Sequence, residues 1–157
     1  MRRTEKEITD RQEIDAIIHG SAVCRLGLAR DNIPYVVPVS FGYDGEALYF
    51  HTALTGKKID YFAANDTVCF ELERNVALVP DAKEACRWTF AFESVIGYGH
   101  VSEIITEEEK ASALQQIMSH YSDREWMLDA ERVASTRVWR ITIEQVTGKR
   151  SHIKPRA

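Results

Sequence analysis

The spacing of hydrophobic and polar positions predicts one short helix followed by a series of strands. Ile14, Ile17 and Ile18 recur at helical spacing behind Asp10, which can cap a helix, and Gly20 can end it. Alternating or continuous apolar runs then predict three strands separated by turn signals, which is typical of antiparallel hairpins. These strands are expected over residues 22–29, 33–41 and 47–52, with turns at Asp31-Asn32 and Asp44-Gly45.

The remaining pattern predicts a helix over 55–64, a strand over 67–74, a charged connection over 75–87, a long strand over 88–105, a capped helix from Thr106, and a last strand over 136–149. Gly97 and Gly99 are expected to bend the long strand, in which alternate positions from 90 to 98 share one face. About six strands in a meander indicate an α+β fold, mainly β, built on a small antiparallel barrel. We expect a single domain over residues 1–157.

Two prolines lie inside the second predicted strand, at Pro34 and Pro38. Proline cannot donate a hydrogen bond to a neighbouring strand, so it favours an edge or a bulge. One interpretation is an edge strand protected against aggregation. The other is a strand that stops pairing where a ligand lies against its backbone. The sequence leaves both open.

Composition and charge narrow the class of protein. The chain has 157 residues, of which 45% are hydrophobic, and a net charge of −4, so neither disorder nor a basic nucleic-acid-binding surface is expected. No apolar run approaches the ~20 residues that span a bilayer. The three cysteines are odd in number and widely spaced, and no secretory signal precedes them. These observations favour a cytoplasmic protein.

The stretch from Thr52 to Lys58 carries the clearest chemical signal. A strand is predicted to end near Thr52 and a helix to begin near Gly56, followed directly by Lys57 and Lys58. Cations at a helix N-terminus are disfavoured by about 0.3–1 kcal/mol each, and a bound anion would reverse that sign. Free helix amides, two lysines and threonine hydroxyls together resemble a phosphate cradle. The alternative is a solvated basic helix start with Thr55 as an ordinary cap.

His51 is the candidate for proton transfer. It adjoins Thr52 on a strand, so the two side chains should face opposite sides. An imidazole with an ordinary pKa of ~6.5 can donate a proton near neutral pH. The alternative is a packed or hydrogen-bonded residue, which is the more common role of a lone histidine near a strand end. No metal-binding spacing, no dinucleotide-binding glycine motif and no nucleophile elbow occurs.

Several motifs in order resemble a known family. They are Pro34 to Asp44 (PYVVPVSFGYD), Leu48 to Ala53 (LYFHTA), Gly56 to Asp60 (GKKID), Val68 to Glu71 (VCFE), Glu93 to Gly99 (ESVIGYG) and Val146 to Lys149 (VTGK). The order and spacing resemble the pyridoxamine 5′-phosphate oxidase-like FMN-binding split barrels, and most of all their 5-nitroimidazole resistance branch. The arginine signature by which pyridoxamine phosphate oxidases hold the substrate phosphate is absent.

The resemblance implies a six-stranded antiparallel split β-barrel with flanking helices, which forms a homodimer with FMN at the interface. It implies that Thr52, Lys57 and Lys58 hold the FMN phosphate, while the backbone along Val36, Val37, Pro38 and Val39 lines the flavin ring. Ser94 and Val95 would contact the flavin from the long strand. Trp139 and Lys149 would approach from the last strand, of the same or the partner chain, and His51 would sit beside the flavin.

The resulting hypothesis is a flavin-dependent oxidoreductase that reduces small electron-poor acceptors such as nitroaromatics, with His51 as the catalytic residue and NAD(P)H as a candidate donor. Two alternatives stay open. One is a flavin-binding electron carrier without a substrate of its own. The other is a binder of haem or a deazaflavin on the same fold. A phosphate cradle would disfavour haem.

Overall fold

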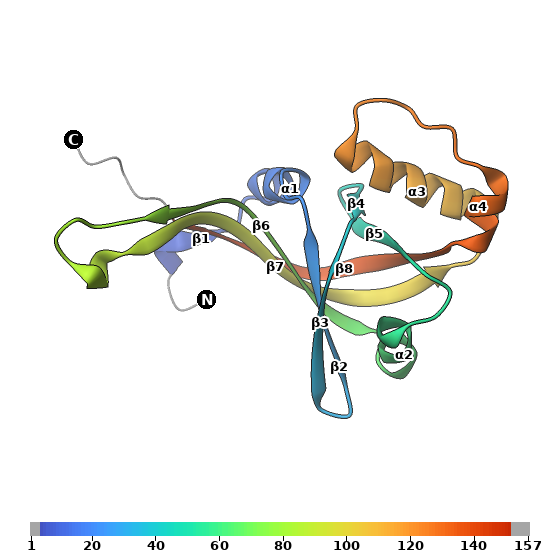
Figure 1. Ribbon diagram of the computed structural model, residues 1–157, viewed down its shortest axis with the longest axis horizontal. Coiled ribbons are helices and arrows are strands. Elements are labelled where there is room, and N and C mark those ends of the chain that lie inside the picture. Colours follow the sequence, from blue (N-terminus) through green and yellow to red (C-terminus); the bar gives the residue numbers. More distant parts are fainter. Residues whose placement is uncertain (1–3, 152–157) are drawn as a thin grey trace.

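A computed structural model describes residues 4–151 (Figure 1). Its strands are β1 (Glu7–Ile8), β2 (Cys24–Arg30), β3 (Ile33–Val39), β4 (Gly42–Tyr43), β5 (Ala47–Thr52), β6 (Thr67–Val79), β7 (Thr89–Ile104) and β8 (Arg137–Ser151). Its helices are α1 (Arg11–His19), α2 (Lys57–Ala64), α3 (Glu107–Tyr121) and α4 (Ala130–Ser135), with short 3₁₀ turns η1 (Thr4–Lys6) and η2 (Ala85–Arg87).

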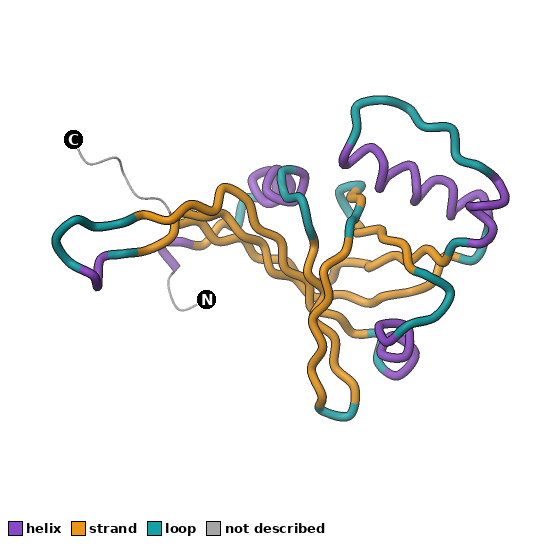
Figure 2. Tube along the Cα trace, viewed as in Figure 1, coloured by secondary structure: helices purple, strands orange, loops and turns teal. Residues whose placement is uncertain are grey.

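All strands belong to one antiparallel sheet. The order is β3-β2-β6-β7-β8-β5-β4, and β1 pairs with β8. Six strands are six residues or longer, and two have only two residues each. The six long strands and the flanking helices confirm the predicted α+β split-barrel fold, while the two short strands were not predicted. Figure 2 shows how the strands cross near the middle of the molecule while the helices lie around them.

Three local features differ from the sequence expectations. The charged connection predicted over 75–87 begins as strand, because β6 continues to Val79 past a bulge at Asn75, whose φ of 56° lies in the left-handed region. Helix α2 begins at Lys57 with Gly56 as its cap, so Thr55 does not cap it. Helix α4 was not predicted and is capped by Asp129.

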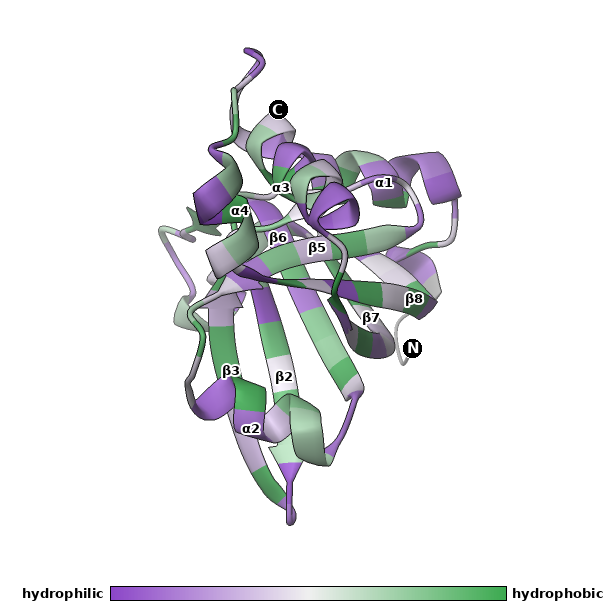
Figure 3. Ribbon diagram, turned by 90° about the vertical axis from the view of Figure 1, so that its right-hand side faces the viewer, coloured by the Kyte–Doolittle hydropathy of each residue, from purple (hydrophilic) through white to green (hydrophobic). Residues whose placement is uncertain are grey.

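Alternation along the strands sets an inner and an outer face of the sheet. Register places Val37, Leu26, Phe70 and Gly97 on one inner row, in which Leu26 and Phe70 are fully buried. Figure 3 shows hydrophobic and more hydrophilic residues alternating along β2. At Gly97 a Cβ atom would come within 2.1 Å of the Phe70 ring, so glycine is required for the rings to pack there.

The last strand joins most parts of the fold. β8 pairs with β1, β5 and β7, and its register with β7 shifts between Tyr98 and Gly99, close to the bend predicted from the glycines. Trp139 packs into the main core, whereas the neighbouring Val138 packs with Ile104 and Ala113 under α3. Both faces of β8 are therefore covered at this end.

Helix α1 is fixed to the sheet by a buried charge cluster. The Glu93 carboxylate, only 7% exposed, accepts hydrogen bonds from Arg74 (2.7 Å), Arg150 (2.6 Å) and Asn75 (2.9 Å). Arg74 also donates to the Ala16 carbonyl at the end of α1. Burial alone raises the pKa of Glu93, but the three hydrogen-bond donors outweigh it, so the pKa lies below its ordinary value.

The far part of the β6–β7 hairpin projects beyond the helices, and we call residues 75–91 the β6–β7 arm (Figures 1 and 2). Within residues 4–151, β8 pairs with β7 no further out than Phe92, so beyond that point the described arm consists of β6 and β7. Its tip is held internally: the Trp88 indole N–H donates to the Asp81 carbonyl, and Arg87 pairs with Glu84 at 2.8 Å.

Candidate functional site

The edge strand β3 borders the site predicted from the sequence. It lies at one end of the sheet order and pairs only with β2 along this path, which confirms the edge interpretation of its prolines. A proline is best placed when its missing N–H points away from the neighbouring strand. The backbone nitrogens of residues 34, 36 and 38 point to the same side of β3, away from β2. Because Pro34 and Pro38 have no N–H, the N–H of Val36 is the one backbone donor expected along this stretch of the free edge.

The side chains of β3 divide between the two faces. Val36 and Pro38 are exposed, Val37 is half-buried and Val39 is buried. A flat ligand along this edge would therefore meet the backbone and the outward pair. The backbone of Val36 to Val39 is the group that the family resemblance assigned to the flavin ring.

At the end of β5, His51 and Thr52 face opposite sides, as alternation predicted: His51 is exposed and Thr52 is 6% exposed. The Thr52 hydroxyl donates to the Ala53 carbonyl (2.8 Å) and accepts a hydrogen bond from the Trp139 indole (3.0 Å). Its single proton is therefore already used within the chain. In this arrangement the Thr52 side chain fixes the turn after β5.

The N-terminus of α2 differs from those of the other described α-helices. Asp10, Thr106 and Asp129 cap α1, α3 and α4 through their side chains, whereas Gly56 caps α2 without a side-chain hydrogen bond. The first amides of α2 therefore lack a side-chain acceptor and direct partial positive charge outward. Lys57 and Lys58 stand directly at this end.

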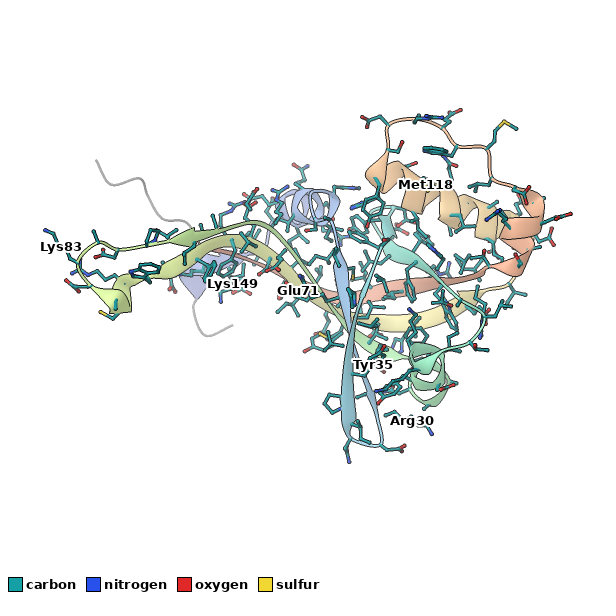
Figure 4. The ribbon with its side chains drawn as sticks, in the orientation of Figure 1. Arg30, Tyr35, Glu71, Lys83, Met118 and Lys149 are labelled. Atoms are coloured by element: carbon teal, nitrogen blue, oxygen red, sulfur yellow. The ribbon has the colours of Figure 1, made fainter. Side chains whose placement is uncertain are left out.

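Lys57 connects this helix start to the edge strand. Its ammonium nitrogen lies 4.5 Å from the centre of the Tyr35 ring on β3 and 5.7 Å from that of Tyr61 on α2. The two rings are themselves 5.3 Å apart. Tyr35 is labelled beside α2 in Figure 4. Cation–π attraction holds Lys57 in place and leaves its charge unneutralised, because neither ring carries a negative charge.

Sequence reasoning missed Arg137, the third cation of this region. Register pairs it with Thr52 across β5 and β8. Arg137 makes a two-point ion pair with Glu103, at 2.7 and 2.5 Å, and donates a further hydrogen bond to the Leu54 carbonyl at 3.2 Å. The Arg137 contact lowers the pKa of Glu103, and the same contact raises that of Arg137. The pairing of β5 with β8, which connects these residues, has no local sequence signal.

The other predicted cofactor residues lie elsewhere in the chain. Val95 is fully buried, and Trp139 is 6% exposed and packs between Phe50 and Phe62, so neither side chain is open to a ligand. Ser94 and Lys149 are half-buried and pair with each other across β7 and β8. Three inter-strand spacings, roughly 14 Å, separate β7 from β3 along the sheet. The contact of Lys57 with Tyr35 joins the start of α2 to β3, whereas Ser94 and Lys149 lie on strands that do not neighbour β3.

Other chemistry-bearing groups are accounted for by packing or exposure. Burial raises the pKa of the Cys24 thiol, Cys69 is half-buried and Cys86 is exposed at the tip of the β6–β7 arm. Among residues 4–151, no group of three or more His, Cys, Asp or Glu side chains is arranged to hold a metal ion. A cavity of about 410 Å³ lies away from the site, lined by residues 5–10 with Glu13 and Arg150.

The sequence places the chain in a family. The profile of the family described as pyridoxamine 5′-phosphate oxidase matches residues 10–150. The chain belongs to this family, as its motifs suggested. A protein of Rhizobium meliloti is 29% identical over 65 residues, which are 41% of this chain and 42% of that protein. The aligned stretch thus spans less than half of this relative.

Solved structures share the fold. A candidate 5-nitroimidazole antibiotic resistance protein from Bacteroides thetaiotaomicron is 34% identical, with a TM-score of 0.81 over 91% of this chain and 85% of that one. Flavocytochrome Anf3 from Azotobacter vinelandii is 21% identical, with a TM-score of 0.84 over 100% and 74%. An FAD- and haem-binding protein from Mycobacterium smegmatis is 18% identical, with a TM-score of 0.80 over 97% and 76%. The last two show likeness of fold alone.

A separate observation concerns membranes. No α-helix within the described part of the chain has both the length and the apolar character to cross a bilayer.

Proposed function

We propose that this chain is an FMN-binding flavoprotein that reduces small electron-poor acceptors such as nitroaromatics. The observation that carries the proposal is the start of α2: a helix end without a side-chain cap, followed by Lys57 and Lys58 and adjoining the proline-protected edge of β3. This combination suits a ligand with a phosphate at one end and a flat ring at the other. Kinship with the structure named for 5-nitroimidazole resistance supports the acceptor class.

In this proposal the amides at the start of α2, with Lys57 and Lys58, hold the phosphate. Thr52, Trp139 and Arg137 fix the turn that leads to these amides. The backbone of Val36 to Val39 lies along the ring. Helix amides and ammonium groups favour a dianionic phosphate over a neutral hydroxyl, so FMN should bind more tightly than riboflavin.

Bound FMN would supply hydride transfer, with NAD(P)H as the donor that we expect. Reduction of a nitro group to a nitroso group takes up one hydride and one proton, and one nitro oxygen leaves with these two hydrogens as water. His51 is the residue that we assign to proton donation, from an imidazole nitrogen that solvent reprotonates. Its exposed side chain at the end of β5 leaves it accessible to solvent.

The proposed active form is a homodimer with the flavin at the interface. Ser94 on β7 and Lys149 on β8 lie on strands that do not neighbour β3 in the sheet order, so in the proposed shared site they would come from the second copy. Val95 and Trp139 are buried, so in this proposal they would not touch the flavin and would instead support the strands that line the site.

The first test is cofactor retention and phosphate preference. The purified protein should keep a flavin absorption spectrum after incubation with FMN and desalting, and should bind riboflavin at least tenfold more weakly. Replacing both Lys57 and Lys58 by Ala should remove most of that preference. Lys83→Ala, at the far end of the β6–β7 arm (Figure 4), is the matched control and should leave it unchanged. Equal affinity for the two flavins would contradict the phosphate site.

The second test addresses the reductase activity. With NAD(P)H and a nitroaromatic, wild-type turnover should exceed that of His51→Ala by roughly 100-fold, within the usual range for a positioned acid. The flavin content of the variant should be unchanged. Full turnover by His51→Ala would remove His51 from the chemistry.

A further inference from the structure

The last residue of α3 is a tyrosine whose hydroxyl lies between two segments of the sheet. The Phe41 N–H donates a hydrogen bond to the Tyr121 hydroxyl, and that hydroxyl donates in turn to the Ala22 carbonyl, each at 3.0 Å. Phe41 lies just after β3, and Ala22 lies just before β2. A side chain from a helix therefore joins the end of the edge strand to the start of its neighbour.

The two backbone groups that Tyr121 connects are those of the next hydrogen bond in the sheet. The pairing of β2 with β3 ends with Cys24 opposite Val39, and continuing this register by two residues sets Ala22 opposite Phe41. The backbone nitrogens of residues 35, 37 and 39 point toward β2, and the same alternation directs the Phe41 N–H that way. The Tyr121 hydroxyl therefore takes the place of a direct hydrogen bond from Phe41 to Ala22.

This inserted hydroxyl holds the ends of the two strands apart. Two 3.0 Å contacts that meet at one oxygen atom separate the Phe41 nitrogen from the Ala22 oxygen by roughly 5 Å, whereas a direct hydrogen bond needs ~2.9 Å. The register of β3 with β2 accordingly stops at Val39, and the chain turns away into β4.

Contacts on both sides of Tyr121 fix the end of α3, which lies beside β4 (Figure 1). His120 Nε2 is 2.8 Å from the Ser21 carbonyl, which can only accept, so this nitrogen carries the proton and donates it. The imidazole also packs on the buried Phe41 ring, with 4.1 Å between ring centres. A Cβ atom on Gly42 would come within 2.5 Å of the Gln116 backbone, so α3 and β4 touch backbone to backbone. The hydroxyl therefore has a fixed position relative to the sheet.

We propose that Tyr121 is a positioning residue for the β3 edge, because its hydroxyl sets the point at which β3 separates from β2. Val39 is only two residues from Phe41, and Val36 carries the one backbone N–H expected on the free edge. β3 is paired on one side only along the sheet order, so a displacement at Phe41 is opposed by β2 alone. The consequence for the flavin ring, which is assigned to this backbone, rests on the proposed function.

Amide exchange in the flavin-free protein tests the position of β3. Tyr121→Phe removes only the hydroxyl, so the Phe41 N–H should meet water and exchange at least tenfold faster than in the wild type. Tyr49→Phe is the matched control, because its hydroxyl also donates a hydrogen bond, to Asp44 at 2.7 Å, away from the β2–β3 pairing. This control should leave the exchange of Phe41 unchanged. An unchanged exchange rate in Tyr121→Phe would overturn the proposal.

Removal of the whole ring tests the replaced hydrogen bond. A hydrogen bond from the Phe41 nitrogen to the Ala22 carbonyl would give a scalar coupling between the nitrogen and the carbonyl carbon in NMR spectra. The wild type should lack this coupling. Tyr121→Ala leaves the space between the strands empty, so they should close and the coupling should appear, while circular dichroism shows that the variant is folded. A coupling in the wild type, or none in folded Tyr121→Ala, would contradict the proposal.

Flavin binding tests the consequence for the site. Tyr121→Phe should bind FMN and riboflavin about fivefold more weakly, with the preference for FMN retained, because the ring meets a displaced β3. The long-wavelength absorption band of the bound flavin should also shift, which a general loss of stability would not cause. Tyr49→Phe should match the wild type in both measurements.

The two kinds of measurement separate the two proposals. Wild-type flavin affinity and an unshifted band in Tyr121→Phe would remove Tyr121 from the positioning of the site. A wild type that binds no flavin would refute the proposed function, while the NMR results, obtained without flavin, would still decide whether Tyr121 fixes the end of β3.

Discussion

Arg137 on β8 and Glu103 on β7 form a two-point ion pair, and Nη1 of Arg137 donates a hydrogen bond to the Leu54 carbonyl. The pair thus ties the sheet to the turn between β5 and α2. A guanidinium held in a fixed plane by a carboxylate is a rigid donor, so the Leu54 carbonyl and the following residues are held in register with the sheet.

We expect Arg137→Gln to weaken FMN binding about tenfold, or ~1.4 kcal/mol, because the turn before α2 loses its anchor. The affinity for riboflavin should change less than twofold, because riboflavin has no phosphate to bind at the start of α2. Isothermal titration of both ligands measures the two effects. Glu103→Gln, which leaves Arg137 in place, should give a smaller loss in the same direction. An equal loss for both flavins would show that Arg137 acts on the fold in general.

Glu93→Gln should lower the free energy of unfolding by on the order of 3 kcal/mol, because two guanidinium groups would lose a buried carboxylate. This loss is at the low end of the range for breaking a buried ion pair, because the side chains of Arg74 and Arg150 are each about a quarter exposed to solvent. Urea unfolding gives the value. Glu73→Gln, in an exposed pair with Arg25, should cost less than ~1 kcal/mol. Similar losses for the two variants would contradict the role of burial.

The same carboxylate should give the protein an acid-sensitive stability. Because the pKa of Glu93 is lowered in the folded state, its stabilisation is complete above the ordinary glutamate pKa and is lost as pH falls through the lowered value. Wild-type stability should therefore fall more steeply than that of Glu93→Gln between about pH 5 and pH 3. Parallel curves over that range would be evidence against a lowered pKa.

His100 should titrate above the ordinary histidine range. Its Nδ1 lies 3.2 Å from Asp66 and its Nε2 3.3 Å from Glu144, and the contact with Asp66, followed by the charges of both carboxylates, raises its pKa. A raised pKa means that this stabilisation is present below about pH 6.5 and is lost as pH rises through the folded value. NMR titration of the imidazole measures the shift. Asp66→Asn should move the pKa back toward the ordinary value, and no movement would remove Asp66 as its cause.

Gly97→Ala should destabilise the barrel by about 2 kcal/mol or more, because the added Cβ would overlap the Phe70 ring. Gly27→Ala is the matched control, since the nearest atoms to a Cβ there lie at an ordinary 3.5 Å. Thermal unfolding of the two variants gives the comparison. If Gly97→Ala were as stable as Gly27→Ala, the Phe70 ring would have room to move aside.

Much of the fold could be predicted because its signals are local. The caps at Asp10 and Thr106, the turn at Asp31-Asn32 and the alternation in β5 each depend on a few neighbouring residues. The extension of β6 to Val79 could not be predicted from the sequence. The charged residues around this segment are typical of a loop, and the segment is a strand because it pairs with β7.

The candidate site divides in the same way. Lys57 and Lys58 stand out in the sequence because cations at a helix start are unusual. The contact of Lys57 with Tyr35 and the support from Arg137 depend on elements that meet only in the folded chain. The burial of Trp139 follows from its packing against Phe50 and Phe62, which the local sequence does not show.

The position of β8 in the chain sets the order in which the molecule can be completed. During synthesis the N-terminal strand β1 and the strand β5 leave the ribosome long before residues 137–151, yet both wait for those residues as their partner. Until then the nascent chain holds open sheet edges and an uncovered core. We therefore expect a translation pause or truncation anywhere before β8 to demand chaperone protection, because β1 and β5 then lack the strand that pairs with them.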